Sequence, residues 1–320
     1  MPIATSPTRI ALAGTGAFGR RHLESLVTID DAELAVVVTP HRDEARDVAL
    51  RFGAAEAATD LADVLKRDDI DAVILCTPTP LHAQQAIAAL RSGKHVQVEI
   101  PVADNWADVR AVAAAQRETG RICMVGHTRR FNPSHRWIRH RLGTGEFRLQ
   151  QLEVRTHFLR RSNLNALNQP RTWTDHLLWH HAAHTVDLLR YQTREDIVAA
   201  HAIRGPDHPG LGIAMDMAVH LLTSGGTVCT LSLSFNNDGP QGSTFRYIGD
   251  TATYLAHYDA LTSGRGEPID LSPFDATPGV EGQDREFVAA IRENREPESS
   301  LTAVLDGYRT LAELEQLLAA

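Results

Sequence analysis

The stretch that decides the fold is Ile10-Ala11-Leu12-Ala13-Gly14-Thr15-Gly16-Ala17-Phe18-Gly19. Its apolar start predicts a strand, and the Gly-x-Gly-x-x-Gly pattern predicts a tight turn into a helix. Gly14 permits the turn, Gly16 lets backbone N–H groups approach a phosphate, and Gly19 lets the helix pack closely on the strand. A purely structural turn is the alternative. The position of the pattern in a first strand–helix–strand unit favours a pyrophosphate, so we expect a dinucleotide to bind here. The expected contacts are Gly14, Thr15, Gly16, Ala17, Phe18 and Gly19.

Outward from this turn, short apolar runs alternate with helical segments as far as Gly126. The predicted strands are Ile10–Ala13, Leu34–Val38, Ala72–Cys76, His95–Val98 and Ile122–Val125. Helices are expected between them, among them Pro80–Arg91 and a segment between Asp104 and Gly120. This alternation predicts an α/β domain over residues 1–126, a Rossmann fold with a doubly wound parallel sheet.

After Gly126, strands follow one another without helices between most of them. The predicted strands are Gln150–Leu159, Ile213–Leu222, Val228–Phe235, Phe245–Gly249 and Thr253–Tyr258. The predicted helices are Trp173–Arg190, Gly282–Glu293 and Leu301–Leu318. Residues 127–320 are therefore expected to form an α+β domain for substrate binding and oligomerisation, with a large, mainly antiparallel, open-faced sheet.

The composition limits the possible partners. The 320 residues are 43% hydrophobic and 22% charged with a net charge of −8, which is typical of a globular protein and argues against nucleic-acid binding. No apolar run approaches the ~20 residues of a membrane span, and no signal peptide is recognisable. The three cysteines match no disulfide set or metal knuckle, so we expect reduced thiols and a cytoplasmic location.

The residues after the second strand predict the choice of dinucleotide. An acid there would accept a hydrogen bond from the 2′-hydroxyl of NAD, but none occurs before Asp43. Thr39, His41 and Arg42 suit a 2′-phosphate instead, which predicts NADP, with NAD possible at lower efficiency. The alternative is that His41 and Arg42 are only solvated loop residues.

Three further patterns carry a family resemblance: Thr77-Pro78 with His82, the run from Gly93 to Pro101, and His184-x-x-Asp187. With them, the chain resembles the glucose–fructose oxidoreductase / inositol dehydrogenase family over nearly its whole length. The resemblance implies oxidation or reduction of sugar-like hydroxyls, and association through the sheet into a homodimer or tetramer. It also implies cofactor contacts from Thr77, Pro78, His82 and Glu99, with Glu99 beside the nicotinamide ribose.

One departure from the family removes a catalytic group. Most relatives read Glu-Lys-Pro where this chain has Glu99-Ile100-Pro101, and the lysine usually assists proton removal. Ile100 cannot do so. Lys66 and Lys94 are the only lysines, and neither is placed by sequence as a replacement.

Three longer runs are similar to one branch of the family: residues 126–133, 173–184 and 232–240. That resemblance implies NADP-dependent oxidation of the cyclic hemiacetal of a dicarboxylic semialdehyde, in the catabolism of protocatechuate and related aromatic compounds. A sugar or polyol dehydrogenase and a non-catalytic dinucleotide-sensing protein are the alternatives.

A histidine-rich segment is the expected source of the base. On a helical wheel, Trp173, His176, His180, His184 and Asp187 fall within about 80° of one another. His184 is predicted to be the general base, oriented by Asp187, because histidine titrates near neutral pH. His180 is a substrate contact or the alternative base. A third metal ligand is not evident beside His180 and His184, so no metal is predicted.

A dicarboxylate substrate requires cations, and arginine suits carboxylates best. The predicted substrate contacts are His127, Thr128, Arg129, Arg130, Arg160, Arg161, His180 and His181, with Arg171 and Arg246 as further candidates. Residues 236–238 are interpreted as a turn.

Overall fold

The structure is a computed structural model, and it describes residues 6–164, 170–171, 173–272, 274 and 277–319. Contacts divide these residues into two units. The first contains residues 6–127, Leu164 and 280–305, and the second contains 128–163, the described part of 170–279, and 306–319. The polypeptide therefore passes from the first unit to the second after His127, close to Gly126, and returns to the first unit for residues 280–305.

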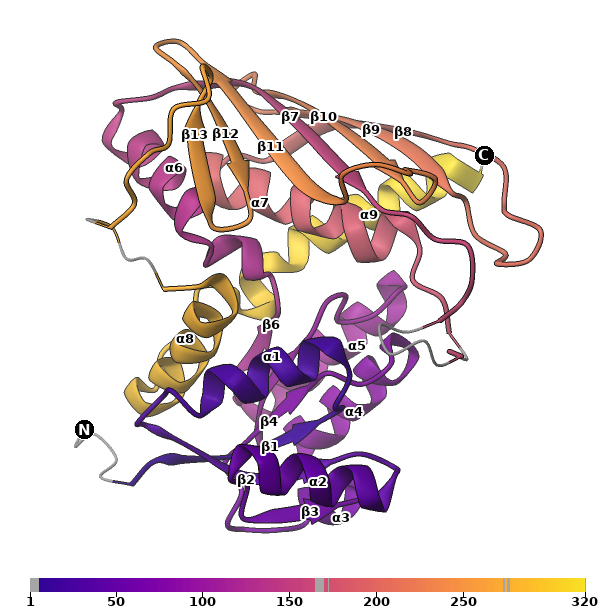
Figure 1. The fold of residues 1–320 in the computed structure, drawn as a ribbon, viewed down its shortest axis with the longest axis vertical. Helices are drawn as coiled ribbons and strands as arrows, with labels where there is room; N and C mark the ends of the chain where they lie inside the picture. The colour runs from indigo at the N-terminus through magenta and orange to yellow at the C-terminus, as the bar shows by residue number, and fades with distance from the viewer. Residues whose placement is uncertain (1–5, 165–169, 172, 273, 275–276, 320) are drawn as a thin grey trace. The chain divides into compact units, whose positions relative to one another are not determined.

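The first unit is built on a parallel sheet (Figure 1). Its described strands are β1 (Thr8–Ala13), β2 (Ala32–Val38), β3 (Glu56–Ala58), β4 (Ala72–Leu75), β5 (His95–Val98) and β6 (Cys123–Val125). Its described helices are α1 (Ala17–Leu26), α2 (Arg42–Phe52), α3 (Leu61–Leu65), α4 (Thr79–Arg91), α5 (Trp106–Thr119) and α8 (Gly279–Glu293). The strand order β3-β2-β1-β4-β5-β6 reverses between β1 and β4, so right-handed crossovers place α1 and α2 on one face and α4 and α5 on the other. This confirms the doubly wound Rossmann fold.

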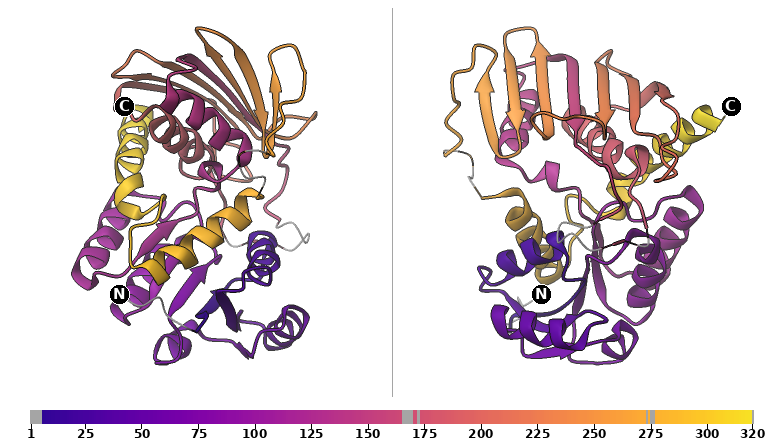
Figure 2. Two further views of the ribbon diagram at one scale, coloured as in Figure 1. Left: turned by 90° about the vertical axis from the view of Figure 1, so that its left-hand side faces the viewer. Right: turned by 45° about the vertical axis from the view of Figure 1, so that its right-hand side comes forward.

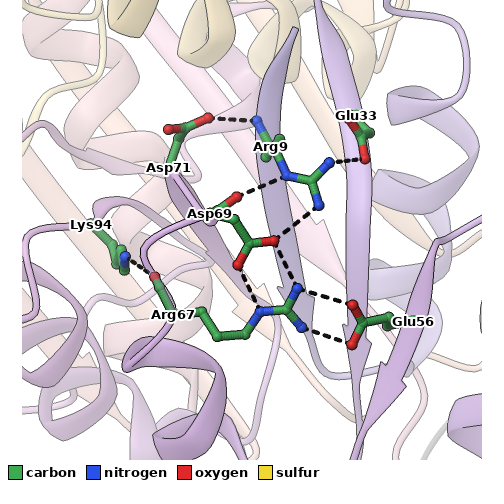
Figure 3. A network of polar contacts seen from close by, with 7 residues as sticks. All are labelled: Arg9, Glu33, Glu56, Arg67, Asp69, Asp71 and Lys94. Carbon is green, nitrogen blue, oxygen red and sulfur yellow. Dashed lines mark hydrogen bonds and ion pairs between the residues drawn. The ribbon is translucent and has the colours of Figure 1, made fainter.

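Ion pairs hold the amino-terminal edge of this sheet (Figure 3). Arg9, at the start of β1, donates to the Asp71 carboxylate (2.8 Å) and pairs with Glu33 at the start of β2. Arg67 pairs with Glu56 of β3 (2.8 Å), and Lys94 donates to the backbone oxygen of Arg67. The paired charges are partly exposed to solvent, so each ion pair contributes only about 0–1 kcal/mol. The network occupies the edge opposite to the glycine-rich turn.

The second unit contains an open sheet with the strand order β13-β12-β11-β7-β10-β9-β8 (Figures 1 and 2). Its described strands are β7 (Leu149–His157), β8 (Ile197–Arg204), β9 (Asp216–Thr223), β10 (Val228–Ser234), β11 (Gly242–Gly249), β12 (Thr253–His257) and β13 (Ala260–Ser263). Its described helices are α6 (Pro133–Thr144), α7 (Ala183–Thr193) and the part of α9 (Leu301–Ala319) that follows Leu305. All strand pairs are antiparallel except β7 with β10. The mainly antiparallel sheet is thus confirmed.

The faces of this sheet differ in burial. Odd-numbered residues of β9 and β10, such as Val219 and Leu231, are buried, and α6 and α7 lie on that side of the sheet (Figure 1). Even-numbered residues such as His220 and Ser232 are exposed. One face is therefore packed and the other is open, as antiparallel sheets allow.

The predicted helix Trp173–Arg190 is wrong in its first half. Residues Leu177–Ala182 form a π-helical segment, α7 follows from Ala183 to Thr193, and Trp173 and residues 174–176 lie outside any helix. A π-helical turn contains more residues than an α-helical turn, so a wheel drawn at 100° per residue fails here.

Candidate active site

The glycine-rich turn connects β1 to α1, and each glycine has a different reason to be there. Gly14 has φ +99°, and a Cβ on it would overlap the backbone oxygen of Cys76 after β4. A Cβ on Gly19 would overlap the backbone oxygen of Gly14. A Cβ on Gly16 would meet no described atom within 4 Å, so packing within the protein does not require glycine there. A ligand that approaches the backbone would account for Gly16.

The start of α1 fits an anion. Gly16 is the N-cap residue of α1 and gives no side-chain cap, so the first N–H groups of the helix are not capped by a side chain, as in phosphate-binding turns. Ala17 and Phe18 are exposed in the first turn of α1, with Phe18 48% exposed. These residues therefore fit the pyrophosphate of a dinucleotide.

Basic side chains and a carboxylate follow β2 closely in the sequence. Thr39 is buried at the end of the strand, while His41 and Arg42 are exposed at the start of α2. Thr15 of the glycine-rich turn donates a 2.6 Å hydrogen bond to Glu44 on the first turn of the same helix. Glu44 was not predicted from sequence, and it puts a carboxylate close to the group expected to bind the ribose.

His82 joins two loops at the same edge of the sheet. Its ring nitrogens lie 2.7 Å from the backbone oxygen of Thr77 and 2.8 Å from that of Pro101. Pro78 is the N-cap residue of α4, which begins at Thr79. Burial lowers the pKa of His82. His82 therefore fixes the loops that follow β4 and β5, which are two of the loops where a dinucleotide is expected.

Glu99 directly follows β5, and its side chain is buried and hydrogen-bonded. It is 7% exposed, and its Oε1 lies 3.1 Å from His22 Nε2 and 3.3 Å from Gln283 Nε2. A Cβ on Gly126, after β6, would overlap this oxygen. Both His22 and Gln283 were missed from sequence. Gln283 follows Glu99 by 184 positions, and no local pattern connects them.

In the second unit, the Asp175 carboxylate contacts three basic side chains. It accepts two hydrogen bonds from Arg160 (2.6 Å each), pairs with Arg171 (2.9 Å) and lies 3.6 Å from His181. Burial alone would raise the pKa of Asp175, but His181 and Arg160 lower it far below its ordinary range. Two guanidinium groups share one carboxylate, and burial lowers the pKa of Arg171. The cluster therefore favours an additional anion.

Aromatic rings flank this cluster. The guanidinium of Arg171 lies over Trp173 (4.8 Å), and Trp173 is stacked on His180 at 5.9 Å and 19°. His176 makes an edge contact with the His180 ring at 5.1 Å. Arg160 and His181 both contact the ring of Phe235. Trp173, His176 and His180 thus come together as predicted, but through a loop and a π-helical segment rather than along one α-helix.

The remaining arginines differ in their partners. Arg130 is buried and forms a two-point ion pair with Asp187 (2.6 and 2.8 Å). Arg129 is buried with its guanidinium 4.7 Å from the ring of Tyr258. Both carboxylate oxygens of Asp187 thus accept a hydrogen bond from Arg130, and the role of Asp187 in orienting His184 stays a prediction.

Other predicted substrate contacts are spread over the second unit, except His127. His127 is buried after β6 in the first unit, and Thr128 begins a 3₁₀ turn in the second. Arg161 donates to Asn236 (3.0 Å), while Arg246 lies 3.5 Å from Glu153 on the sheet. His184 is partly exposed in the first turn of α7.

The described residues contain no group of three side chains suited to hold a metal. In the same part of the chain, none of the helices combines the length and apolar character that crossing a bilayer requires. Lys66 pairs with Asp63, and Lys94 lies in the network at the amino-terminal edge, so neither lysine lies at the edge that carries Glu99.

Comparison with known proteins identifies the class. Residues 8–127 match the oxidoreductase family with an NAD-binding Rossmann fold, and residues 133–275 match the C-terminal domain of bacterial oxidoreductases. The chain belongs to this oxidoreductase family and is an oxidoreductase of the dehydrogenase type with a dinucleotide-binding domain. It is 58% identical over 308 residues to 4-carboxy-2-hydroxymuconate-6-semialdehyde dehydrogenase of Sphingobium sp. (strain NBRC 103272 / SYK-6), covering 96% of this chain and 98% of that protein.

More distant relatives share the fold. scyllo-Inositol 2-dehydrogenase (NAD(+)) of Bacillus subtilis (strain 168) is 37% identical over 139 residues, which cover 43% of this chain and 41% of that protein. The crystal structure of aldose-aldose oxidoreductase from Caulobacter crescentus superimposes with a TM-score of 0.85 at 20% identity, covering 98% of each chain. These likenesses agree with the two-sheet architecture.

Proposed function

We propose that this protein oxidises the cyclic hemiacetal of 4-carboxy-2-hydroxymuconate-6-semialdehyde to 2-pyrone-4,6-dicarboxylate, with NADP as the hydride acceptor. The observation that carries the proposal is the Asp175 cluster. Arg160 and Arg171 exceed the one carboxylate in charge, and the Trp173 ring, stacked on His180, lies beside Arg171. A planar ring with carboxylates matches such a site in charge and shape. The 58% identity to a dehydrogenase named for this semialdehyde supports the same substrate.

The reaction removes a hydride and a proton from one H–C–O–H unit. The bound dinucleotide supplies the hydride acceptor. We assign the hydroxyl proton to His184, with His180 as the alternative, because histidine exchanges protons near neutral pH. The carbon–oxygen bond becomes the carbonyl of the pyrone, so charge and atoms balance without a further reactant. His181, Arg160, Arg161 and Arg171 are assigned to the substrate carboxylates.

The proposed preference for NADP over NAD depends on the residues that follow β2. Arg42 and His41 are exposed and free to meet a 2′-phosphate, and Thr39 ends the strand before them. Glu44, however, would accept a hydrogen bond from the 2′-hydroxyl of NAD and repel the 2′-phosphate of NADP. The first turn of α2 thus carries one charge that favours each nucleotide.

The deciding experiment is an absorbance assay at 340 nm. The substrate is generated in place from protocatechuate by a 4,5-dioxygenase, and NADP and NAD are compared at equal low concentration. Glucose and inositol serve as controls for the alternative, a sugar or polyol dehydrogenase. Reduction with the ring-cleavage product alone supports the proposal, whereas activity on a polyol alone refutes it. Silence with every substrate, together with intact dinucleotide binding, would favour a sensing protein.

The Asp175 cluster can be tested by substitution in the same assay. Arg171→Gln removes the guanidinium that shares Asp175, so KM for the semialdehyde should rise at least about tenfold, the loss of one charged hydrogen bond. Arg246→Gln is the matched control, because Arg246 lies on the sheet near Glu153. Equal KM values for both variants would remove the cluster from substrate binding.

A further inference from the structure

A buried chain of polar groups in the first unit is not explained by the proposed chemistry. His22 of α1 is fully buried, with Nδ1 2.8 Å from Asp284 Oδ1 and Nε2 3.1 Å from Glu99 Oε1. Asp284, on α8, also accepts a 2.7 Å hydrogen bond from Gln97 of β5. These hydrogen bonds therefore connect α1, which follows the glycine-rich turn, β5, which leads to Glu99, and α8, which comes late in the sequence.

The geometry indicates the protonation of His22. A neutral imidazole has one N–H group, so one of its nitrogens would direct a lone pair at a carboxylate oxygen. An imidazolium donates at both nitrogens, to Asp284 Oδ1 and to Glu99 Oε1. A buried charge is retained only when it is paired in this way. Burial alone would lower the pKa of His22, but Asp284 and Cys76 raise it well above its ordinary value, in agreement with the geometry.

The two oxygens of Glu99 have different surroundings. Oε1 receives His22 and Gln283. Among the described residues no hydrogen-bond partner of Oε2 is found, although the Glu99 side chain is only 10% exposed. The carboxylate is thus fixed through one oxygen, and the other can accept a hydrogen bond from a ligand hydroxyl.

We propose that His22 is a positioning residue, which as an imidazolium braced by Asp284 holds Glu99 so that Oε2 receives a hydroxyl of the bound dinucleotide. This inference rests on the assignment of Glu99 to the cofactor in the proposed function. It adds that the affinity of the first unit for its dinucleotide depends on Asp284, 262 positions from His22.

The test is a double-mutant cycle in dinucleotide binding, which needs no substrate. Dissociation constants for NADPH and NADH are measured by fluorescence titration for wild type, His22→Gln, Glu99→Gln and the double variant. We expect His22→Gln to weaken binding about tenfold, the equivalent of one charge-assisted hydrogen bond. In the Glu99→Gln background the same change should have no further effect. Because the hemiacetal is not used, a failure of the substrate proposal leaves this result readable.

Several outcomes overturn the inference. Additive losses in the cycle would mean that His22 acts on the fold rather than through Glu99. Wild-type affinity in His22→Gln or in Glu99→Gln would remove the connection altogether. His95→Gln is the control: His95 begins β5 and accepts the Ile122 N–H (3.1 Å), so it should leave the affinity unchanged. An equal loss in His95→Gln would point to general loosening of the strand.

A second measurement keeps the inference testable if His22→Gln fails to fold. In wild-type protein with ¹⁵N-labelled histidine, the His22 signal is identified as the ring signal that Asp284→Asn shifts. Both ring nitrogens should carry protons at about pH 8, above the ordinary range for histidine. A neutral ring at that pH would refute the imidazolium and the proposal with it.

Discussion

The glycine-rich turn offers a paired perturbation, Gly16→Ala against Gly19→Ala. Both add one methyl group within three residues, but the structure gives the two methyl groups different neighbours. The Cβ at position 19 would overlap the Gly14 carbonyl oxygen and lie 2.9 Å from its carbon, which are backbone atoms that cannot turn aside. The Cβ at position 16 would meet no described atom within 4 Å, and its backbone (φ −64°) is ordinary for alanine.

The expected magnitudes follow from these contacts. Overpacking costs about 1–3 kcal/mol, so Gly19→Ala should lower the melting temperature by roughly 2–12 °C. Gly16→Ala loses the N-cap preference of glycine but also reduces the freedom of the unfolded chain, so the unfolding free energy should change by less than about 1 kcal/mol. A methyl group there would instead displace a pyrophosphate from backbone N–H groups. Each lost hydrogen bond to a charged group is worth about 1.5–3 kcal/mol, which is about tenfold to a hundredfold in Kd.

The assays are thermal unfolding by circular dichroism and NADPH titration by fluorescence. Gly16→Ala should keep the wild-type melting temperature and lose affinity, while Gly19→Ala should lose stability. Wild-type NADPH affinity in Gly16→Ala would show that this turn does not bind the pyrophosphate. An unchanged melting temperature in Gly19→Ala would refute the packing argument.

Four further predictions follow from the structure. His184→Ala should lower kcat at least about a hundredfold with NADPH affinity unchanged, as for a general base, and wild-type kcat would remove His184 from the reaction. Arg42→Ala should weaken NADPH binding about tenfold but not NADH binding, and an equal change in both would count against a 2′-phosphate contact. Light scattering should find a homodimer or tetramer, which Ile203→Arg on the open face of β8 dissociates (Ile203 is 73% exposed), whereas a wild-type monomer would contradict this. Burial lowers the pKa of His22, but Asp284 raises it by more, so the folded-state pKa lies above the ordinary value. The stability that this proton provides is therefore full below about pH 6.5 and falls as pH rises through the folded-state pKa. The difference in melting temperature between wild type and His22→Gln should shrink from about pH 6 to pH 9, and a growing difference would be inconsistent with an imidazolium.

Features encoded locally could be predicted from sequence. The glycine-rich turn, the parallel strands and the change to an antiparallel sheet each depend on residues that are neighbours along the chain. Strand β8 was not predicted, because its run of small and apolar residues from Ile197 lies largely exposed and lacks a clean alternation. The π-helical segment was missed because it has no signature beyond that of an α-helix.

The site could be predicted only in part, for a different reason. Arg160, Arg171 and His181 were chosen for their chemistry, but their common partner Asp175 has an unremarkable setting in the sequence. The partners of Glu99 lie 77 and 184 positions away. Contacts across such distances are fixed by the packing of α1 and α8, to which a single sequence gives no direct access.

The absence of a lysine beside Glu99 and the proposed substrate support each other. A sugar hydroxyl is a weak acid, and a lysine that can lose and regain its proton helps to remove that proton. The hydroxyl of a hemiacetal is more acidic, because the second oxygen on the same carbon withdraws electrons from it. A histidine can then serve as the base, since proton transfer is efficient when the base is matched to the acid. Replacing that lysine by Ile100 is therefore tolerable for a hemiacetal and damaging for a polyol. On this reasoning Ile100→Lys should bring little gain with the ring-cleavage product, whereas a large gain would show that the histidines do not supply the base.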